Sequence, residues 1–273
     1  MLLQNPGAVA GLVIIGALIL SAAFANHVVP HDPFKPDPTI VLMPPRVGHW
    51  MGTDNLGRDM LSRIILGGRW SLSVGLIAVC ISASVGLPLG LLAGYSGVLV
   101  DTLISRGIEV VMAIPGVLLA IAVIAVLGPG SWNVMLAVGI AGIPRYVRLI
   151  RSSVLSARED AYVEAARGLG CSEPRVMFRH ILPNIVAPTI VLGSIDVAAA
   201  ILAASSLGFL GFGAQPPIPE WGALLSQARA FMRTAWWLTA FPGMAIMLTV
   251  LSMNLIGDGL RDALDPRLRR EGF

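Results

Sequence analysis

Six long apolar segments limit what this chain can fold into. They cover, in chain order, residues 8–29, 70–95, 102–127, 131–150, 184–213 and 236–257. A helix needs about 20 mostly apolar residues to cross the hydrocarbon core of a bilayer, and it makes its backbone hydrogen bonds internally. Only 13% of the residues are charged, against about 25% in a typical soluble domain. The sequence therefore predicts an all-α, polytopic membrane protein with six transmembrane helices.

The connecting segments divide the chain into three parts. The first apolar segment has no basic region before it and no clear cleavage site after it, so we interpret it as a retained transmembrane helix and not as a signal peptide. Residues 30–69 are polar and rich in proline, which predicts an exposed subdomain. We expect a helix plus extracytoplasmic segment over residues 1–69, a membrane domain over 70–258 with a polar loop at about 156–183, and a tail over 259–273.

The arginines predict the orientation, because short loops rich in basic residues stay in the cytoplasm. One group lies around the polar loop and another in the tail: Arg145, Arg148, Arg151, Arg158, Arg167, Arg175 and Arg179, then Arg261, Arg267, Arg269 and Arg270. With six spans, both groups and the N-terminus lie on one side, which we expect to be cytoplasmic. A smaller, opposing group is mixed with aspartates and consists of Lys35, Arg46, Arg58, Arg63 and Arg69. Because the basic residues flank the membrane, the net charge of +3 does not indicate a nucleic-acid partner.

The polar loop is predicted to contain two short helices that project into the cytoplasm at an angle. In the first, Tyr162, Ala165, Ala166 and Leu169 recur at helical spacing and form one apolar stripe, which leaves Glu164 off that stripe.

Gly170 is expected to end the first helix in the left-handed conformation. Ser172 then caps a second helix that has Pro174 in its first turn, and the loop ends at Leu182-Pro183. An ordinary connector has no need of this whole spaced pattern, so we predict that the loop docks a soluble partner.

Asp196 lies deep in the fifth apolar segment, where a carboxylate is costly and usually functional. Three roles remain open for it: lining a translocation path, hydrogen bonding to Ser194 or a partner chain, or structural packing at a subunit interface. Glu109 needs no such explanation, because Arg106 lies three residues earlier on the same helical face and provides a local ion pair.

Glycines and prolines predict how the spans pack. Gly86, Gly90 and Gly94 recur every fourth residue and predict a face where another helix backbone approaches closely. The alternative is chance, since the chain has 30 glycines. Pro88 and Pro115 lie within apolar segments and predict kinks.

Residues 219–231 predict an amphipathic helix on the outer face, with Trp221, Leu224, Leu225 and Ala228 on its apolar side. Three placements fit it: resting on the bundle, lying in the membrane interface, or forming a lip for an extracellular partner.

The sequence predicts neither a cofactor nor a catalytic site. The only lysine, Lys35, precedes Pro36, so there is no G-x-x-x-x-G-K-[ST] loop for nucleotide phosphates, and energy must come from another polypeptide or an ion gradient. The hydrolase patterns H-E-x-x-H and G-x-S-x-G are also absent. His27 and His31 have a metal-pair spacing, but Pro30 between them argues against one helix, so we expect no metal ion.

The polar loop resembles the EAA loop of ABC importer permeases. Glu164-Ala165-Ala166, Gly170 and His180-Ile181-Leu182-Pro183 fit the pattern E-A-A-x(3)-G-x(9)-I-x-L-P, with His180 in place of isoleucine as the single departure. Further segments resemble signatures of the dipeptide/oligopeptide/nickel family: Gly52-Thr53-Asp54, Gly57-Arg58-Asp59, Ala113-Ile114-Pro115, Phe209-Leu210-Gly211-Phe212-Gly213, Pro219-Glu220-Trp221-Gly222 and Leu264-Asp265-Pro266-Arg267. The chain is thus similar to the C-type permease subunits of this family.

The resemblance implies a type I ABC importer permease in a bacterial inner membrane. Its partners would be membrane lipids, a second homologous permease, two ATPase subunits that bind ATP and Mg²⁺, and an extracytoplasmic substrate-binding protein. The residues implied to couple it to the ATPases are Glu164, Ala165, Ala166, Gly170, Leu182 and Pro183. Family members carry dipeptides, oligopeptides, glutathione, nickel chelates or opines, and we expect short peptides here.

A path lined by small residues, such as Gly86, Ala93, Ala203 and Ala204, would suit peptides, which share a backbone and differ in side chain.

Two other classes of membrane protein compete with the importer. A self-sufficient secondary transporter predicts inverted repeats with paired broken helices, and the sequence shows no convincing repeat. A scaffolding membrane protein is the third class.

Overall fold

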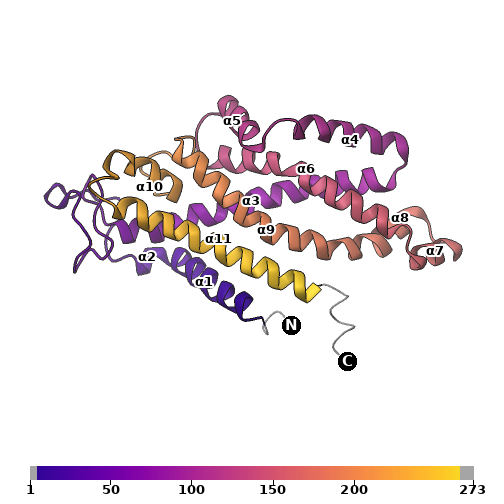
Figure 1. Cartoon of the computed structure of the whole chain (residues 1–273), viewed down its shortest axis with the longest axis horizontal. Helices are drawn as coiled ribbons and strands as arrows, with labels where there is room; N and C mark the ends of the chain where they lie inside the picture. Colours follow the sequence, from indigo (N-terminus) through magenta and orange to yellow (C-terminus); the bar gives the residue numbers. More distant parts are fainter. Residues whose placement is uncertain (1–4, 265–273) are drawn as a thin grey trace.

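The structure is a computed structural model that describes residues 5–264, and it is a bundle of helices (Figure 1). The helices are α1 (Pro6–Ala23), α2 (Ala25–Val28), α3 (Met60–Tyr95), α4 (Val98–Met112), α5 (Gly116–Leu127), α6 (Ser131–Ala157), α7 (Ala161–Gly168), α8 (Glu173–Arg175), α9 (Leu182–Phe209), α10 (Trp221–Ala228) and α11 (Trp237–Leu264). Five helical stretches are long and apolar enough to cross a membrane, and the bent pair α4–α5 makes a sixth if it counts as one span. The predicted all-α fold with six transmembrane helices is confirmed.

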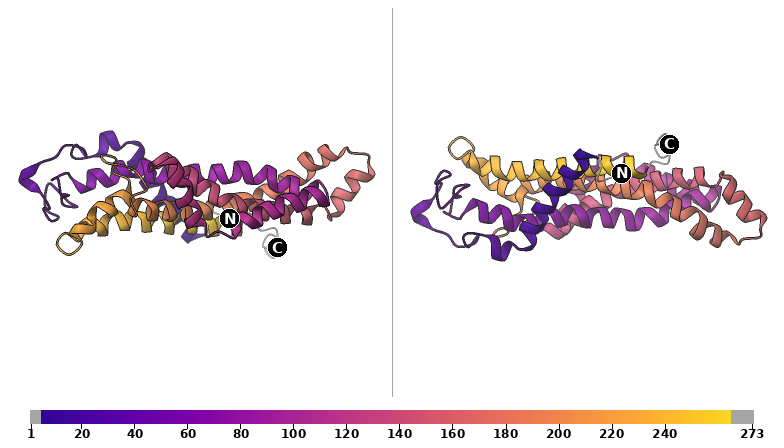
Figure 2. Two further views of the ribbon diagram at one scale, coloured as in Figure 1. Left: turned by 90° about the horizontal axis from the view of Figure 1, so that it is seen from above. Right: turned by 90° about the horizontal axis from the view of Figure 1, so that it is seen from below.

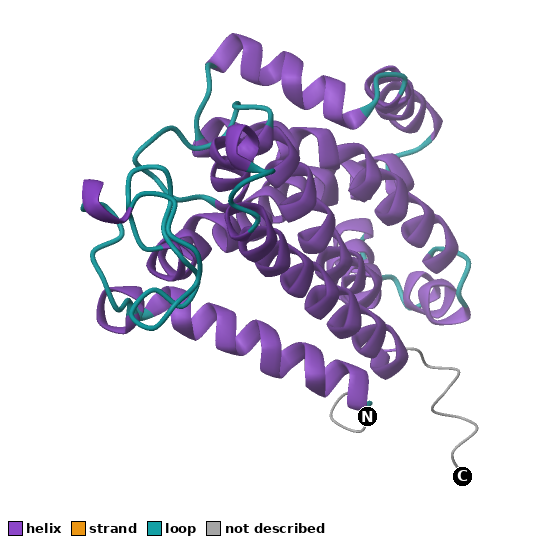
Figure 3. Ribbon diagram, turned by 60° about the vertical axis from the view of Figure 1, so that its left-hand side comes forward, coloured by secondary structure: helices purple, strands orange, loops and turns teal. Residues whose placement is uncertain are grey.

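The helices are arranged around α3, α6 and α9. Helices α1 and α11 pack together on one side of this centre, and α4 and α5 lie on the other (Figures 1 and 3). The loops before α3 and the short α10 lie at one end of the bundle, and α7 lies at the opposite end (Figure 2). Helix α1 begins and α11 ends toward the α7 end (Figure 1). The predicted tail at 259–273 overlaps the last turns of α11, and its part beyond residue 264 lies outside the described residues.

The fifth span begins earlier than expected. Helix α8, a π-helical turn over Val176–Ile181 and α9 form one continuous helical stretch over Glu173–Phe209. At 1.5 Å per residue its 37 residues measure about 55 Å, whereas a bilayer core is about 30 Å thick. The prediction of a second, separate short helix is therefore wrong, because this segment is the projecting end of a membrane helix.

Proline acts differently at the two predicted kinks. The third span breaks into α4 and α5 with a bend of 87° at Pro115. Proline disfavours the helical conformation in the residue before it and lacks an amide hydrogen, so the hydrogen-bond ladder ends there. Helix α3, in contrast, continues through Pro88.

The glycine face of α3 packs against α6, as predicted. A Cβ added at Gly86 would lie 2.4 Å from Cβ of Tyr146, and one at Gly90 would lie 2.7 Å from Cβ of Ile150. At Gly94 the same construction meets Cβ of Val154 at 2.7 Å. No Cβ fits at such distances, so the glycines set the spacing of the two central helices.

Replacing Gly90 by alanine is therefore expected to destabilise the bundle by about 1–3 kcal/mol, the usual cost of overpacking. Gly107→Ala in α4 is the matched control, because a Cβ there meets no atom within 4 Å. Thermal unfolding of the purified chain in detergent measures both. Equal midpoints for Gly90→Ala and Gly107→Ala would contradict this packing.

Helix α10 closes the end of the bundle opposite α7. Trp221, Leu224 and Ala228 of its predicted apolar side are buried, so it rests on the bundle. The carboxylate of Glu220 caps α10 by accepting from the amides of Gly222 at 2.8 Å and Ala223 at 2.9 Å. Burial raises the pKa of this carboxyl. The indole Nε1 of Trp221 donates to the carbonyl of Ile64 in α3 at 2.9 Å, and α10 also contacts α9. The sequence did not reveal that Glu220 and Trp221 hold α10 in this place.

Three of the basic residues that opposed the orientation rule have structural roles. Arg58 pairs with Asp54 at 2.7 Å from Nε to Oδ2, and Arg63 lies 3.5 Å from the same oxygen, all three being buried. Arg69 donates from Nε to the carbonyl of Ala22 at 2.6 Å, which satisfies an orphan carbonyl at the end of α1. Because these side chains are held in the fold, they count little against the orientation that the two larger arginine groups predict.

Candidate coupling surface and intramembrane cavity

The polar loop forms α7, a tight turn and the start of the long helix. Helix α7 ends in a Schellman turn, in which the amide of Gly170 donates to the carbonyl of Arg167 at 2.9 Å and that of Cys171 donates to Ala166 at 3.1 Å. Gly170 has φ = +81°, so the predicted left-handed conformation is confirmed. An added Cβ would meet nothing within 4 Å, so glycine is needed here for its backbone and not for space.

The face of α7 that packs on the bundle differs from the predicted stripe. Val163 and Ala166 are buried in a cluster with residues of α6 and the π-helical turn. Tyr162 and Ala165 are exposed, and Leu169 is 86% exposed. The prediction fails because α7 is too short for four stripe positions to reach the bundle, and because Leu169 is its C-cap, beyond the last turn.

The outward surface of this loop combines charge with apolar groups. Glu164 is exposed, as predicted, and Ala165 lies beside it. Leu169 and Phe178 add two large exposed apolar side chains. Exposed apolar groups on a projecting element are typical of protein interfaces. We name these four residues the α7 surface.

Side chains from α3 and α6 hold the turn. The Tyr95 hydroxyl donates to the carboxylate of Glu173, which also pairs with Arg167 at 3.4 Å. Arg158 donates to the carbonyl of Gly94 at 2.9 Å, and its guanidinium lies 5.5 Å from the centre of the Tyr95 ring. These contacts tie the turn to the ends of both central helices, and sequence reasoning did not identify them.

The remaining predicted coupling residues begin α9. Pro183 lacks an amide hydrogen and cannot donate to the carbonyl four residues earlier, and the π-helical turn directly before α9 lies at this break. Leu182 joins the apolar cluster that contains Ala166. The other predicted coupling residues lie on the surface of this end: Glu164, Ala165, Gly170 and Pro183.

A cavity of about 200 Å³ lies between α3, α5, α6 and α9. Small side chains such as Ala78, Ala120, Ala141 and Gly142 make up much of its lining. The path expected along Gly86, Ala93, Ala203 and Ala204 is only partly right. Of these four residues, Ala203 lines the cavity, whereas Gly86, Ala93 and Ala204 are buried in helix packing.

Asp196 lines this cavity and forms an ion pair with Arg145 of α6, which lines it too. The Asp196 side chain is 8% exposed and that of Arg145 is 61% exposed. Ser194 is not the partner, because its hydroxyl donates to the carbonyl of Val191 at 2.8 Å. Sequence reasoning counted Arg145 among the membrane-flanking arginines. The pairing could have been suspected from its place within an apolar segment, since a lone intramembrane carboxylate needs a counter-charge.

A second interhelical ion pair was not predicted from the sequence. Asp101, in the first turn of α4, accepts from Nη2 of Arg151 on α6 at 2.7 Å. No residue of α4 is buried, and this pair joins α4 to α6. The predicted Arg106–Glu109 pair is confirmed at 2.9 Å on the exposed face of the same helix.

A helical membrane bundle with an internal cavity and a projecting loop at one end defines the class: a polytopic membrane protein built for transport. The chain matches the family described as binding-protein-dependent transport system inner membrane component over residues 86–270. Residues 1–45 match the N-terminal TM domain of oligopeptide transport permease C. The chain belongs to the family of binding-protein-dependent transport system inner membrane components.

Relatives support this assignment along nearly the whole chain. The dipeptide transport system permease protein DppC of Alkalihalophilus pseudofirmus is 47% identical, with 97% of this chain and 88% of the relative covered. The glutathione transport system permease protein GsiD of Pectobacterium atrosepticum is 45% identical, with the same shares covered. In fold, the chain is similar to an inward-facing structure of the MetNI methionine ABC transporter, with a TM-score of 0.63 and 16% identity over 76% of this chain and 98% of that one. The predicted resemblance to C-type permeases of the peptide class is confirmed.

Proposed function

We propose that this chain is a permease subunit that moves short peptides into the cytoplasm, driven by separate ATPase subunits. The observation that carries the proposal is that one continuous helical stretch contains both sites. The helical stretch Glu173–Phe209 begins next to the α7 surface and contributes Asp196 to the cavity. A push on one end therefore acts on the other.

The proposed partners supply the functions that this chain does not itself provide. The α7 surface receives an ATPase subunit, which binds ATP and Mg²⁺, and this chain contributes no nucleotide site. A second, homologous permease completes the path, and a binding protein delivers cargo to the end formed by α10 and the loops before α3. The proposed domain division is an N-terminal part over residues 1–69, a permease domain over 70–258 and a tail over 259–273.

Peptide cargo is supported by the cavity and by the relatives. A zwitterionic peptide carries an ammonium and a carboxylate, and Asp196 and Arg145 offer one partner to each in a lining whose other residues are mostly small and apolar. Relatives named for dipeptides and for di- and tripeptides are 47% and 46% identical. Glutathione, itself a tripeptide, is the second candidate, because relatives named for it are 45% identical.

Deleting the gene tests the cargo. We expect loss of growth on dipeptides as the sole source of a required amino acid, restored by the gene on a plasmid. Unchanged dipeptide uptake together with lost glutathione uptake would shift the proposal to glutathione. Unchanged peptide uptake with reduced nickel-dependent enzyme activity would replace peptides by nickel chelates.

The proposed orientation places α7 and both termini in the cytoplasm. Two exposed positions at opposite ends of the bundle test it: Val47 is 94% exposed and Leu169 is 86% exposed. In a background without Cys80 and Cys171, we expect Val47→Cys to react with a membrane-impermeant maleimide in intact cells. In cells that lack the ATPase subunits, which would otherwise cover the α7 surface, Leu169→Cys should react only after permeabilisation, and the reverse pattern contradicts the orientation.

A further inference from the structure

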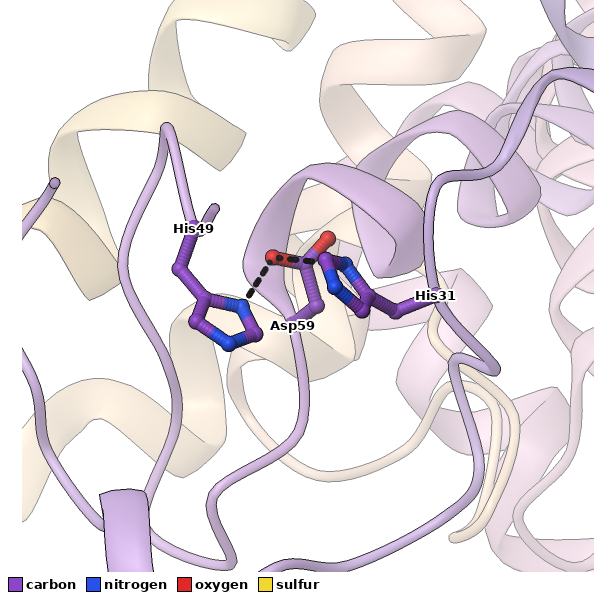
Figure 4. A group of neighbouring side chains, drawn as sticks. All are labelled: His31, His49 and Asp59. Atoms are coloured by element: carbon purple, nitrogen blue, oxygen red, sulfur yellow. Dashed lines mark hydrogen bonds and ion pairs between the residues drawn. The ribbon is translucent and has the colours of Figure 1, made fainter. Parts of the chain in front are cut away.

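Three side chains that can each offer a metal ligand, His31, His49 and Asp59, meet at the start of α3 (Figure 4). Nδ1 of His49 lies 2.9 Å from Oδ1 of Asp59, and Nδ1 of His31 lies 3.8 Å from the same oxygen. The two imidazole rings stack, with centroids 4.5 Å apart and planes at 28°. One ligand atom from each residue lies within 4.8 Å of the other two.

Local structure brings the three together from separate segments. His31 follows α2, and its amide donates to the Ser62 hydroxyl at 3.2 Å. His49 lies in a turn closed by two backbone hydrogen bonds with Arg46, each of 3.0 Å. Asp59 caps α3, and its Oδ2 accepts from the amide and hydroxyl of Ser62 at 2.8 and 2.7 Å. Oδ2 is thus fixed, and Oδ1 faces both rings.

Hydrogen bonding explains only half of this arrangement. The carboxylate oxygen accepts from His49, but a separation of 3.8 Å is too long for a hydrogen bond from His31. A divalent cation accounts for the approach of both rings to one carboxylate oxygen, because imidazole nitrogens and a carboxylate are its ordinary ligands.

The spacing is near that of a small transition-metal site, because the three ligand atoms lie within 4.8 Å of one another. Zinc binds nitrogen and oxygen at about 2.0–2.2 Å, which places tetrahedral ligand atoms about 3.3 Å apart. The Asp59 side chain is 1% exposed, whereas those of His49 and His31 are 15% and 42% exposed. The carboxylate is therefore the fixed ligand, and the two rings, which lie on loops, close on an ion that enters from solvent.

We propose that His31, His49 and Asp59 bind one divalent transition-metal ion, with zinc the best match and water as fourth ligand. The ion ties the loop after α2 and the turn at 46–49 to the start of α3, and so clamps the external subdomain on the bundle. This departs from the expectation of no metal ion. The spacing in the sequence suggests His27 as the partner of His31. In the fold, His31 lies beside His49, which is 18 positions away in the chain.

Zinc titration of the purified full-length chain in detergent tests the site. The chain carries a tag without histidine, is stripped with a chelator and competes with a chromophoric zinc indicator. We expect one zinc ion per chain, bound about 100-fold or more tightly than by the double variant His31→Ala/His49→Ala, because loss of an outer-shell partner alone costs about 10–100-fold. His27→Ala, an exposed histidine of α2 outside the cluster, is the matched control and should bind as the wild type does.

Equal zinc binding by the wild type and the double variant, or none by the wild type, would overturn the proposal. A second measurement decides the case if the double variant does not fold. Co²⁺ added to the stripped wild-type chain should give the visible absorption of a four-coordinate ion with nitrogen and oxygen ligands. A six-coordinate spectrum, or no spectrum beyond free Co²⁺, rejects the site.

Discussion

Reversing the charge of Glu164 is expected to abolish peptide uptake while leaving the protein folded in the membrane. The side chain is exposed at the projecting end and is not part of the buried face of α7, which consists of Val163 and Ala166. A like-charge contact in an interface costs several kcal/mol, and each 1.4 kcal/mol is a tenfold loss of affinity. ATPase docking should therefore weaken by about 100-fold or more in Glu164→Lys.

Glu159→Lys provides the matched control. This glutamate is exposed in the turn just before α7, so it has the same charge and the same side of the bundle but lies outside the α7 surface. Co-purification of the ATPase subunits and uptake into proteoliposomes measure docking and transport. Normal uptake by Glu164→Lys, or equal losses in both variants, would remove Glu164 from the interface.

Gly170→Val should also weaken ATPase docking and peptide uptake, about tenfold and for a different reason. A side chain in the left-handed conformation costs about 1–2 kcal/mol, and the turn that orients the α7 surface depends on that conformation. Gly168→Val is the control, because Gly168 lies in the helical part of α7 and an added Cβ meets no atom within 4 Å. If the two valine variants behave alike, the conformation of Gly170 is not what matters.

Neutralising Asp196 is the second change with a large expected effect. Asp196→Asn keeps the shape of the side chain but leaves Arg145 without its counter-charge in the cavity wall. A hydrogen bond between charged groups is worth about 1.5–3 kcal/mol, and the 61% exposure of Arg145 puts the expected loss of unfolding free energy at the lower end. We expect uptake to fall about tenfold or more.

The double variant Arg145→Gln/Asp196→Asn separates a structural pair from a peptide contact. It should regain most of the thermal stability, because no charge is left unpaired. Uptake should stay low, because the partners for the peptide termini are gone. The exposed pair on α4 is the control, and Arg106→Gln/Glu109→Gln should change neither stability nor uptake. Recovery of uptake in the Arg145/Asp196 double variant would make the pair purely structural.

The sequence predicted the fold well where a local pattern determines the structure. Apolar segments of sufficient length set the spans, the spacing of Gly86, Gly90 and Gly94 set the contact of α3 with α6, and Gly170 set the turn. In each case one periodicity or one backbone requirement decides the outcome, and no distant residue has to be known.

The sequence failed where distant residues decide. Helix α7 was given the wrong buried face because the choice between Val163 and Leu169 depends on how α6 ends beside it. Asp196 and Arg145 are 51 positions apart, and His31 and His49 are 18 apart. Only the three-dimensional packing reveals that these residues meet.

ATP-dependent uptake of a labelled dipeptide into proteoliposomes tests the central claim most directly. The vesicles contain this chain, the second permease and the two ATPase subunits, with binding protein and peptide outside and ATP inside. We predict uptake that requires ATP and both ATPase subunits, and that is lost in Glu164→Lys but not in Glu159→Lys. Uptake by this chain without the ATPases, driven by an ion gradient, would contradict the account.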